Sequence, residues 1–351
     1  MILFFYYIHY KYRINNIIEG IFHMIGKQKS QYSLLDGVFN SRSKKSRTDA
    51  LLEKINQFVD WKELESLCEP MYKESKKGKP SLPIIAAFKC LIVQYLYGLS
   101  DPALEDALID RLSFQRFVGI TFDTDIPDYS TIWRFRNRLI HAGLLDGIFS
   151  GILKQIDSKG LILRKGTIVD ATLVQAARKK RRGGNDTLKN PQLDTDATAT
   201  KRGKKGYYGY KGHIGVDQGS GIIRRVQFTT ASVHDARECR HLISGDERSI
   251  FGDKGYADDA LKRECRKNGV YYGVLDKGRR GRPHLSTRQK KRNRQKSGVR
   301  AVVERPFAHF KRLMGFTRVR YMNLARNELH FMFLCMIENI RTGIVLQTTE
   351  G

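Results

Sequence analysis

The chain has 351 residues, with 63 Lys and Arg against 36 Asp and Glu, and its net charge is +27. So large a charge is most simply explained by a polyanionic partner, and the length allows two domains or one large domain with appendages. The five cysteines are odd in number and form no C-x-x-C pair, which argues against a zinc site and for a reducing compartment.

Residues 1–45 are predicted to be an N-terminal extension that ends in a basic arm. The opening stretch, MILFFYYIHY, is apolar but too short to span a bilayer, and no basic region precedes it as in a secretory signal. We expect translation to start at Met24, with a cleaved signal or anchor as the alternative.

Residues 46–155 are predicted to form a helical domain. The stretch 83–97 is long and nearly all apolar, so it should be a buried helix that ends at Gly98. Asp101 and Pro102 should begin the next helix, as its N-cap and its first residue. The apolar face of that helix is made of Leu104, Leu108 and Leu112.

Residues 127–139, PDYSTIWRFRNRL, have the pattern of the recognition helix of a helix-turn-helix. Arg134 and Arg138 share an outer face because they lie four residues apart. The alternative is a helix whose arginines pair with Asp106 or Asp110. The inward face is made of Ile132, Phe135 and Leu139.

From residue 156 the pattern becomes strand-rich, and two short apolar runs end in aspartate. One run leads to Asp170 and the other, SIFG, leads to Asp253. Each is predicted to be a buried strand that delivers a carboxylate at or near its carboxyl end, where α/β sheets assemble their chemistry. Either aspartate alone is more often a turn residue or a helix cap.

Between these runs the sequence predicts a hairpin, with strands at 210–216 and 222–229. Residues 183–200 are too polar for a core and are predicted to be a mobile loop. His213 should be structural or bind phosphate rather than be a metal ligand, because no second histidine lies at ligand spacing. The dipeptide His-Asp at 234–235 should open a helix as a cap, with catalysis as the alternative.

Residues 277–296 contain ten Lys or Arg and no acid, and they are predicted to stay disordered until phosphates neutralise them. The following stretch, 296–315, is predicted to be an amphipathic helix that its proline kinks or restarts. Arg300, Glu304 and Lys311 share one face of it, because spacings of four and seven return to the same side. A set of exposed ion pairs is the alternative.

The last predicted element is an apolar helix over 331–346, followed by a tail at 347–351. Glu338 and Arg341 interrupt this helix, so we expect it in the core rather than in a membrane.

Asp170, Asp253 and Glu304 together make a set of three carboxylates. Mg²⁺ prefers oxygen ligands and takes few of them from protein, and paired ions clamp both oxygens of an in-line phosphoryl displacement. The sequence therefore predicts that these residues are catalytic and hold two ions of Mg²⁺ or Mn²⁺.

The chain resembles the DDE transposases of bacterial insertion sequences, in the branch named after insertion sequence five. The signature of that branch is tyrosine, two residues, arginine, three residues, glutamate, six residues, lysine. Arg300, Glu304 and Lys311 match this spacing, whereas Ser297 stands at the tyrosine position. Similar blocks occur in the expected order at 126–136, 169–172, 207–213, 230–235 and 253–256.

The resemblance implies an α/β RNase H-like mixed sheet with helices over 156–346, preceded by an all-α N-terminal domain over 46–155 that serves as a helical DNA-binding domain. It implies a transposase that binds the terminal inverted repeats of its element, hydrolyses strand ends with an Mg²⁺-activated water and joins the 3′-hydroxyl to target DNA. Its partners would be double-stranded DNA and a second copy of the chain, in the cytoplasm at the nucleoid and without a membrane. The predicted DNA contacts are Arg134, Arg138, Lys211, His213, Arg300 and Lys311.

Two alternatives stay open. One is an RNase H-like nuclease without strand transfer, and the other is a catalytically inactive, DNA-binding remnant that acts as a repressor. The three carboxylates argue against the remnant, and metal-dependent nicking of an end-bearing duplex would discriminate between the possibilities.

Overall fold

The computed structural model describes residues 45–71, 82–121, 124–177, 193–278, 281 and 284–350. The predicted extension with its start at Met24 lies outside these residues, except for Lys45. The elements, in chain order, are α3 (Arg47–Phe58), α4 (Trp61–Cys68), η1 (Glu69–Met71), α5 (Ile84–Leu96), α6 (Asp101–Asp110), α7 (Leu112–Val118), α8 (Tyr129–Ala142), α9 (Leu145–Ser158), β1 (Thr167–Gln175), β2 (Thr198–Arg202), β3 (Lys205–Asp217), β4 (Ile223–Thr230), α10 (Asp235–Glu238), η2 (Cys239–Leu242), β5 (Ser249–Gly252), η3 (Lys254–Tyr256), α11 (Asp259–Lys267), β6 (Tyr271–Tyr272), α12 (Thr287–Arg312) and α13 (Leu324–Glu350).

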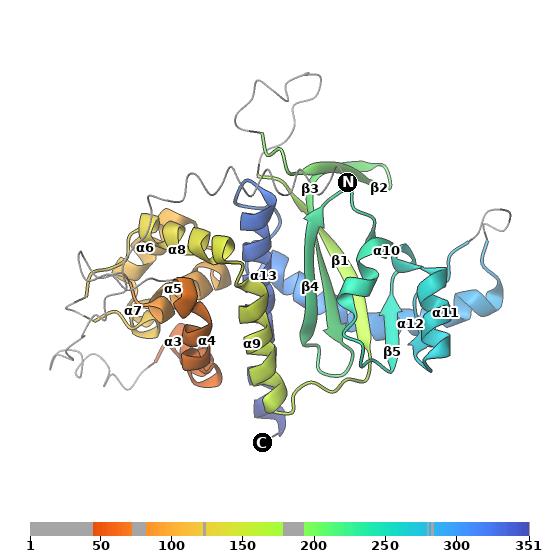
Figure 1. Cartoon of the computed structure of the whole chain (residues 1–351), viewed down its shortest axis with the longest axis horizontal. Coiled ribbons are helices and arrows are strands. Elements are labelled where there is room, and N and C mark those ends of the chain that lie inside the picture. The colour runs from red at the N-terminus through yellow and green to blue at the C-terminus, as the bar shows by residue number, and fades with distance from the viewer. Residues whose placement is uncertain are drawn as a thin grey trace.

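The strands form one mixed sheet, in which β3 pairs with β1, β2 and β4 and is antiparallel to each of them. β5 joins β1 in parallel, and β6 joins β5 in parallel. Helices α3 to α9 come before the sheet in the chain, and α9 is the one of them that lies beside the sheet (Figure 1). Helices α10 and α11 cover one face of the sheet, and α12 crosses the other face. The predicted class, a mixed sheet with helices after an all-α region, is confirmed.

Side chains of β1 alternate between two hydrophobic cores. Ile168 packs in the larger core, which also contains α13, whereas Val169 packs with Tyr256 in a smaller core on the opposite face. This alternation follows from the period of two along a strand. The sheet is therefore buried on both faces, which explains the near-continuous apolar run before Asp170.

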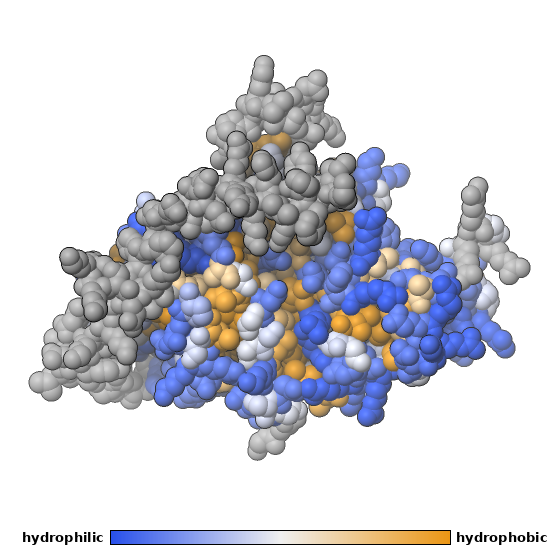
Figure 2. Space-filling model, viewed as in Figure 1, coloured by the Kyte–Doolittle hydropathy of each residue, from blue (hydrophilic) through white to orange (hydrophobic). Residues whose placement is uncertain are grey.

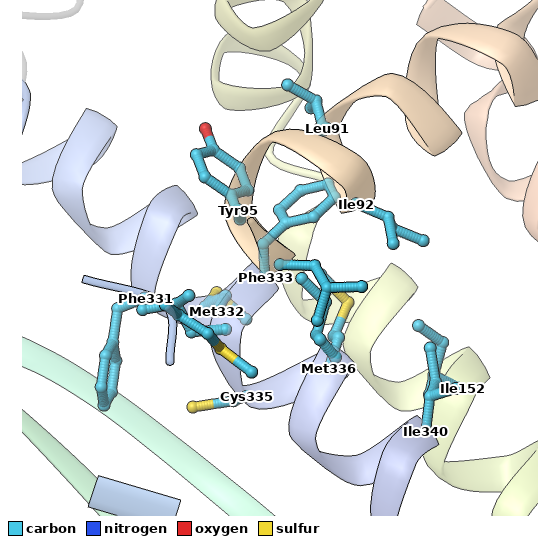
Figure 3. Packing of buried hydrophobic residues seen from close by; sticks show 14 of the residues in the cluster. Leu91, Ile92, Tyr95, Ile152, Phe331, Met332, Phe333, Cys335, Met336 and Ile340 are labelled. Atoms are coloured by element: carbon cyan, nitrogen blue, oxygen red, sulfur yellow. The ribbon is translucent and has the colours of Figure 1, made fainter. Parts of the chain in front are cut away.

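Helix α13 lies between the sheet and the helices α3 to α9, and its side chains belong to one core shared by both regions. Phe331 points to the strands, whereas Phe333 lies beside Tyr95 of α5 and Ile340 lies beside Ile152 of α9 (Figure 3). By length and composition α13 could cross a membrane, but 83% of its most apolar window is buried inside the protein. The prediction of a core helix is confirmed.

Helix α13 also extends further than predicted. It continues to Glu350, so the residues set apart as a tail are helical up to that point. Close packing against the sheet depends on Gly212 of β3, because a Cβ there would lie 2.4 Å from Cζ of Phe331.

The predicted cap of α6 is wrong. Ser100 is the N-cap, and its hydroxyl accepts a hydrogen bond from the backbone of Ala103, so Asp101 is the first helical residue. Either residue is a good cap, and the cap at Ser100 leaves the Asp101 carboxylate available to Arg136. The helix ends at Asp110, so Leu112 belongs to the next helix rather than to the face of α6.

The predicted loop over 183–200 is partly wrong, since its last residues are ordered; residues 183–192 lie outside the described part. The Asp194 side chain is buried and accepts a hydrogen bond from the hydroxyl of Tyr210 at 2.7 Å. β2 then begins at Thr198 and forms a hairpin with β3. Polar composition alone misses such order because the partners are distant in sequence.

Disorder over 277–296 is also contradicted from Ser286 onward. Helix α12 begins at Thr287, because Ser286 and Gln289 form a capping box, and it runs through Pro306 without ending there. The helix was predicted to begin at residue 296. The capping box was visible in the sequence as a serine followed three residues later by glutamine.

Candidate active site at the parallel strand pair

Two aspartates leave neighbouring parallel strands side by side. β1 pairs with β5 so that Val169 lies opposite Gly252, and Asp170 and Asp253 are the next residues in the two strands. Asp253 follows the end of β5, as predicted. Asp170 is not at a strand end, because β1 continues to Gln175 along β3; it is open where the shorter β5 has stopped.

Arg300 of α12 reaches both carboxylates. Its Nη2 lies 3.6 Å from Oδ2 of Asp170, and its Nη1 lies 3.9 Å from Oδ1 of Asp253. The Arg300 side chain is 17% exposed, and its buried Nε has no hydrogen-bond partner in the described part of the chain. A residue predicted to contact DNA thus lies between two predicted catalytic residues, as a cation shared by two acids.

Burial and the charge of Arg300 act in opposite directions on the pKa of Asp170. Burial is the largest influence and raises the pKa of Asp170. A hydrogen bond from the backbone N–H of Ala171 and the charge of Arg300 lower that pKa, whereas Asp253 and Asp235 raise it further. The pKa stays above its ordinary value, so the ionised carboxylate gains from any cation beside it.

Glu304 does not join the two aspartates at ligand distance. It is exposed on α12, one turn after Arg300. Among the residues that the structure describes, no three or more His, Cys, Asp or Glu are close enough together to hold a metal ion. The structure therefore brings two of the three predicted carboxylates together. Those two already enclose a cationic group, which fits them to hold a divalent cation.

Lys211 forms an ion pair with a further acid, Asp235, near Asp170 and Asp253. Its Nζ donates to the backbone oxygen of Val233 at 2.7 Å and to Oδ1 of Asp235 at 2.9 Å. The preceding residue, His234, caps α10 by accepting from the backbone of Ala236, as the sequence predicted. Lys211, which was predicted to contact DNA, therefore forms an ion pair with Asp235, and its side chain is only 13% exposed.

His213 cannot touch DNA in this structure, and its predicted contact is contradicted. Its side chain is completely buried, with Nε2 at 2.9 Å from the hydroxyl of Thr229 and Nδ1 at 3.4 Å from the hydroxyl of Tyr256. Burial lowers its pKa to about 4, so the ring is neutral at pH 7. These contacts fit the other predicted role of His213, a structural one.

The other predicted DNA contacts lie at the surface. Arg134 is exposed and Arg138 is half-buried on α8, and Lys311 is exposed near the end of α12. The arginine that the sequence analysis missed is Arg136, which is 1% exposed and binds Asp101. Its position between the buried residues of α8, at helical spacing, was the available signal.

Comparison with known proteins gives matches along most of the chain. The Transposase domain (DUF772) family matches residues 40–138, and the Transposase DDE domain family matches residues 163–340, just over half of the chain. A solved synaptic complex of piggyBac transposase with hairpin DNA is similar over 86% of this chain and 76% of its own, with 12% identity and a TM-score of 0.47. That likeness is too distant to carry a conclusion about this chain.

The two family matches support the predicted insertion-sequence DDE transposase, while the branch named after insertion sequence five stays a prediction. The mixed sheet with its covering helices and the preceding helical region fit an RNase H-like fold. On the strength of the match over residues 163–340, the chain belongs to the Transposase DDE domain family.

Proposed function

We propose that this protein binds the terminal inverted repeats of its own mobile element and catalyses metal-dependent DNA strand cleavage and strand transfer. The observation that carries the proposal is the pair Asp170 and Asp253, which neighbouring parallel strands bring together around the single cation of Arg300. Family membership supplies the class of reaction. The net charge of +27 supports DNA as the partner.

Asp170 and Asp253 would hold Mg²⁺ or Mn²⁺, two ions per site, with Glu304 as the third ligand after a side-chain adjustment on α12. Bound ions would supply Lewis-acid stabilisation of charge on the phosphate oxygens. Within the chain, burial of Asp170 makes its ionised form depend on a cation. Arg300 supplies such a cation, and its fork lies between the two carboxylates.

The remaining predicted site residues would either contact DNA directly or position another side chain. Arg134 and Arg138 on α8 would bind the inverted repeat, and Lys311 would contact the phosphates at the end of the element. Lys211 would position Asp235, its ion-pair partner, beside the catalytic pair. A second copy of the chain would complete a homodimer on DNA in the cytoplasm, at the nucleoid.

The test uses a duplex that carries one element end and a second duplex that is already cut at that end. We expect nicking of the first duplex with Mg²⁺ or Mn²⁺ and none with EDTA, and joining of the second to target DNA. Nicking without joining would leave the nuclease alternative, and binding without nicking under every metal would overturn the enzyme in favour of an inactive remnant.

A further inference from the structure

The first half of α12 carries an unneutralised row of positive charge. Arg288, Lys290, Lys291 and Arg294 are all exposed, and none of them makes an ion pair with a described residue. The nearby Arg292 differs, because it lies 3.4 Å from Asp276. No acid occurs in α12 before Glu304. We call the four exposed side chains the basic arm of α12.

The basic arm is held in place although its charges repel one another. Like charges three or four residues apart, such as Lys290 and Arg294, destabilise a helix by about 0.2–0.5 kcal/mol per pair. Contacts elsewhere offset this cost. The Asn293 amide makes two hydrogen bonds with the backbone of Asp276, and the buried Lys296 donates to the backbone oxygen of Val274 at 2.8 Å. The charges therefore project from a fixed helix.

The same helix carries Arg300, which contacts both aspartates, so distances along its axis give the separation between the basic arm and the catalytic pair. An α-helix rises about 1.5 Å per residue, which puts Arg294 about 9 Å and Arg288 about 18 Å along the axis from Arg300, the residue that contacts both aspartates. Each strand of B-DNA has one phosphate per about 3.4 Å, so these distances correspond to about three to five base pairs. Hydrophilic residues dominate the part of the surface over α11 and α12 (Figure 2).

We propose that the basic arm of α12 binds phosphates of a DNA duplex about three to five base pairs from the phosphate that is cleaved. This inference rests on the proposed function, because the cleaved phosphate lies at Asp170 and Asp253. Flexible Lys and Arg side chains without base-reading partners bind the backbone, so the contact is independent of sequence. Its role is to fix the register of the duplex on one side of the site.

The experiment removes the four charges together, as R288Q, K290Q, K291Q and R294Q in one chain. Glutamine keeps helix propensity and relieves the repulsion, so the variant should fold, which a urea midpoint checks. Affinity is measured by fluorescence anisotropy for end-bearing duplexes shortened from 12 to 3 base pairs on each side of the cleavage point in turn. The salt dependence is measured for the longest duplex.

For the wild type we expect affinity to fall on one side only, when the duplex becomes shorter than about five base pairs. The variant should show no such fall, and its salt slope on the long duplex should be smaller by up to about 3.6, from about 0.9 per phosphate contact. A variant that keeps the wild-type length dependence would overturn the inference.

A matched control removes four exposed lysines outside α12 instead, as K54Q, K62Q, K165Q and K267Q. It has the same net charge as the test variant, so equal effects of the two would reduce the result to bulk charge and overturn the inference. Cleavage is scored in parallel. A wild type that never cleaves counts against the proposed function, while the length dependence of binding decides the inference.

Discussion

Two arginines each hold acidic side chains, one within the helical region and one above the sheet. Arg136 lies against both oxygens of Asp101, at 2.7 and 3.1 Å, and donates to the hydroxyl of Tyr321. Its guanidinium also lies over the Tyr321 ring, 4.3 Å from the centroid. Arg300 instead divides its fork between Asp170 and Asp253, at 3.6 and 3.9 Å.

The difference in geometry separates a tight ion pair from a loose one. Distances near 2.7–3.1 Å with a planar fork are those of strong, charge-assisted hydrogen bonds, and they fix Arg136 in one place. Arg300 makes no such bond to either aspartate, and its buried Nε has no partner among the described residues. We infer that Arg136 stabilises the fold, whereas Arg300 keeps two acids in place until another cation arrives.

The largest expected effect concerns the acids of the loose pair. Replacing Asp253 with Asn removes the charge but keeps the shape and can still cap η3, so DNA cleavage should fall about a hundredfold or more, a barrier change of at least about 2.7 kcal/mol. DNA affinity and the urea midpoint should stay near those of the wild type. Retained cleavage in D253N would remove the functional half of the comparison.

The second effect concerns the tight pair. Arg136→Ala leaves the Asp101 carboxylate without its partner, so we expect the free energy of unfolding to fall by about 3–5 kcal/mol in urea titrations. Arg134→Ala is the control, because Arg134 is exposed on the same helix and should change stability by no more than about 0.5 kcal/mol. Equal destabilisation by the two variants would contradict the structural role of Arg136.

A third effect sharpens the comparison on α12 itself. We expect Lys311→Ala to weaken binding of a pre-cleaved end by about 1.5–3 kcal/mol and to reduce joining, because it removes a charged phosphate contact, while Arg300→Ala is milder. Anisotropy and a joining assay measure both. Lys311→Arg should recover part of the binding, and wild-type behaviour of the alanine variant would leave this lysine as a surface charge.

The smallest effect is one of stability and pH. Because burial raises the pKa of Asp170 above 3.8, the folded protein binds a proton more tightly than the unfolded chain does. Stability contributed by this group is therefore full below pH 3.8 and is lost as pH rises through the folded pKa. In metal-free buffer we expect Asp170→Asn to be more stable than the wild type at pH 7, with the difference vanishing below pH 3.8.

Urea midpoints of the two proteins between pH 3.5 and pH 7 measure that difference. Taking the difference cancels other titrating groups, such as His213. A wild type that is the more stable protein at pH 7 would show that Arg300 compensates fully for the burial of Asp170, and the distinction between a tight and a loose arginine would fail.

Local patterns predicted the elements whose own residues decide their structure. The apolar run before Asp253 forms β5, and the stretch 83–97 forms the buried α5, because burial on all sides requires continuous apolar sequence. The turn between β3 and β4 is likewise local, since the Asp217 side chain accepts from the backbone of Gly219 and Ser220.

Features that depend on distant partners could not be predicted in the same way. Arg136 meets Asp101 across 35 residues and Tyr321 across 185 residues, and neither spacing has a periodicity to detect. The position of Asp170 within β1, rather than at its end, depends on the length of β3. Asp170 and Asp253 were found because an apolar run leads to each of them, but the loose fork of Arg300 depends on contacts between distant segments.

The placement of α13 has a consequence for how this gene decays. The chain is synthesised from its N-terminus, and α13 emerges after every other described element. Yet the helical region needs it, because Phe88 of α5 packs against Phe333 with ring centroids 5.0 Å apart, and Phe58 of α3 lies against Gly343. A frameshift or stop codon before residue 324 therefore removes the part of the core that α13 supplies to these helices. Copies damaged in this way should be degraded rather than persist as folded fragments.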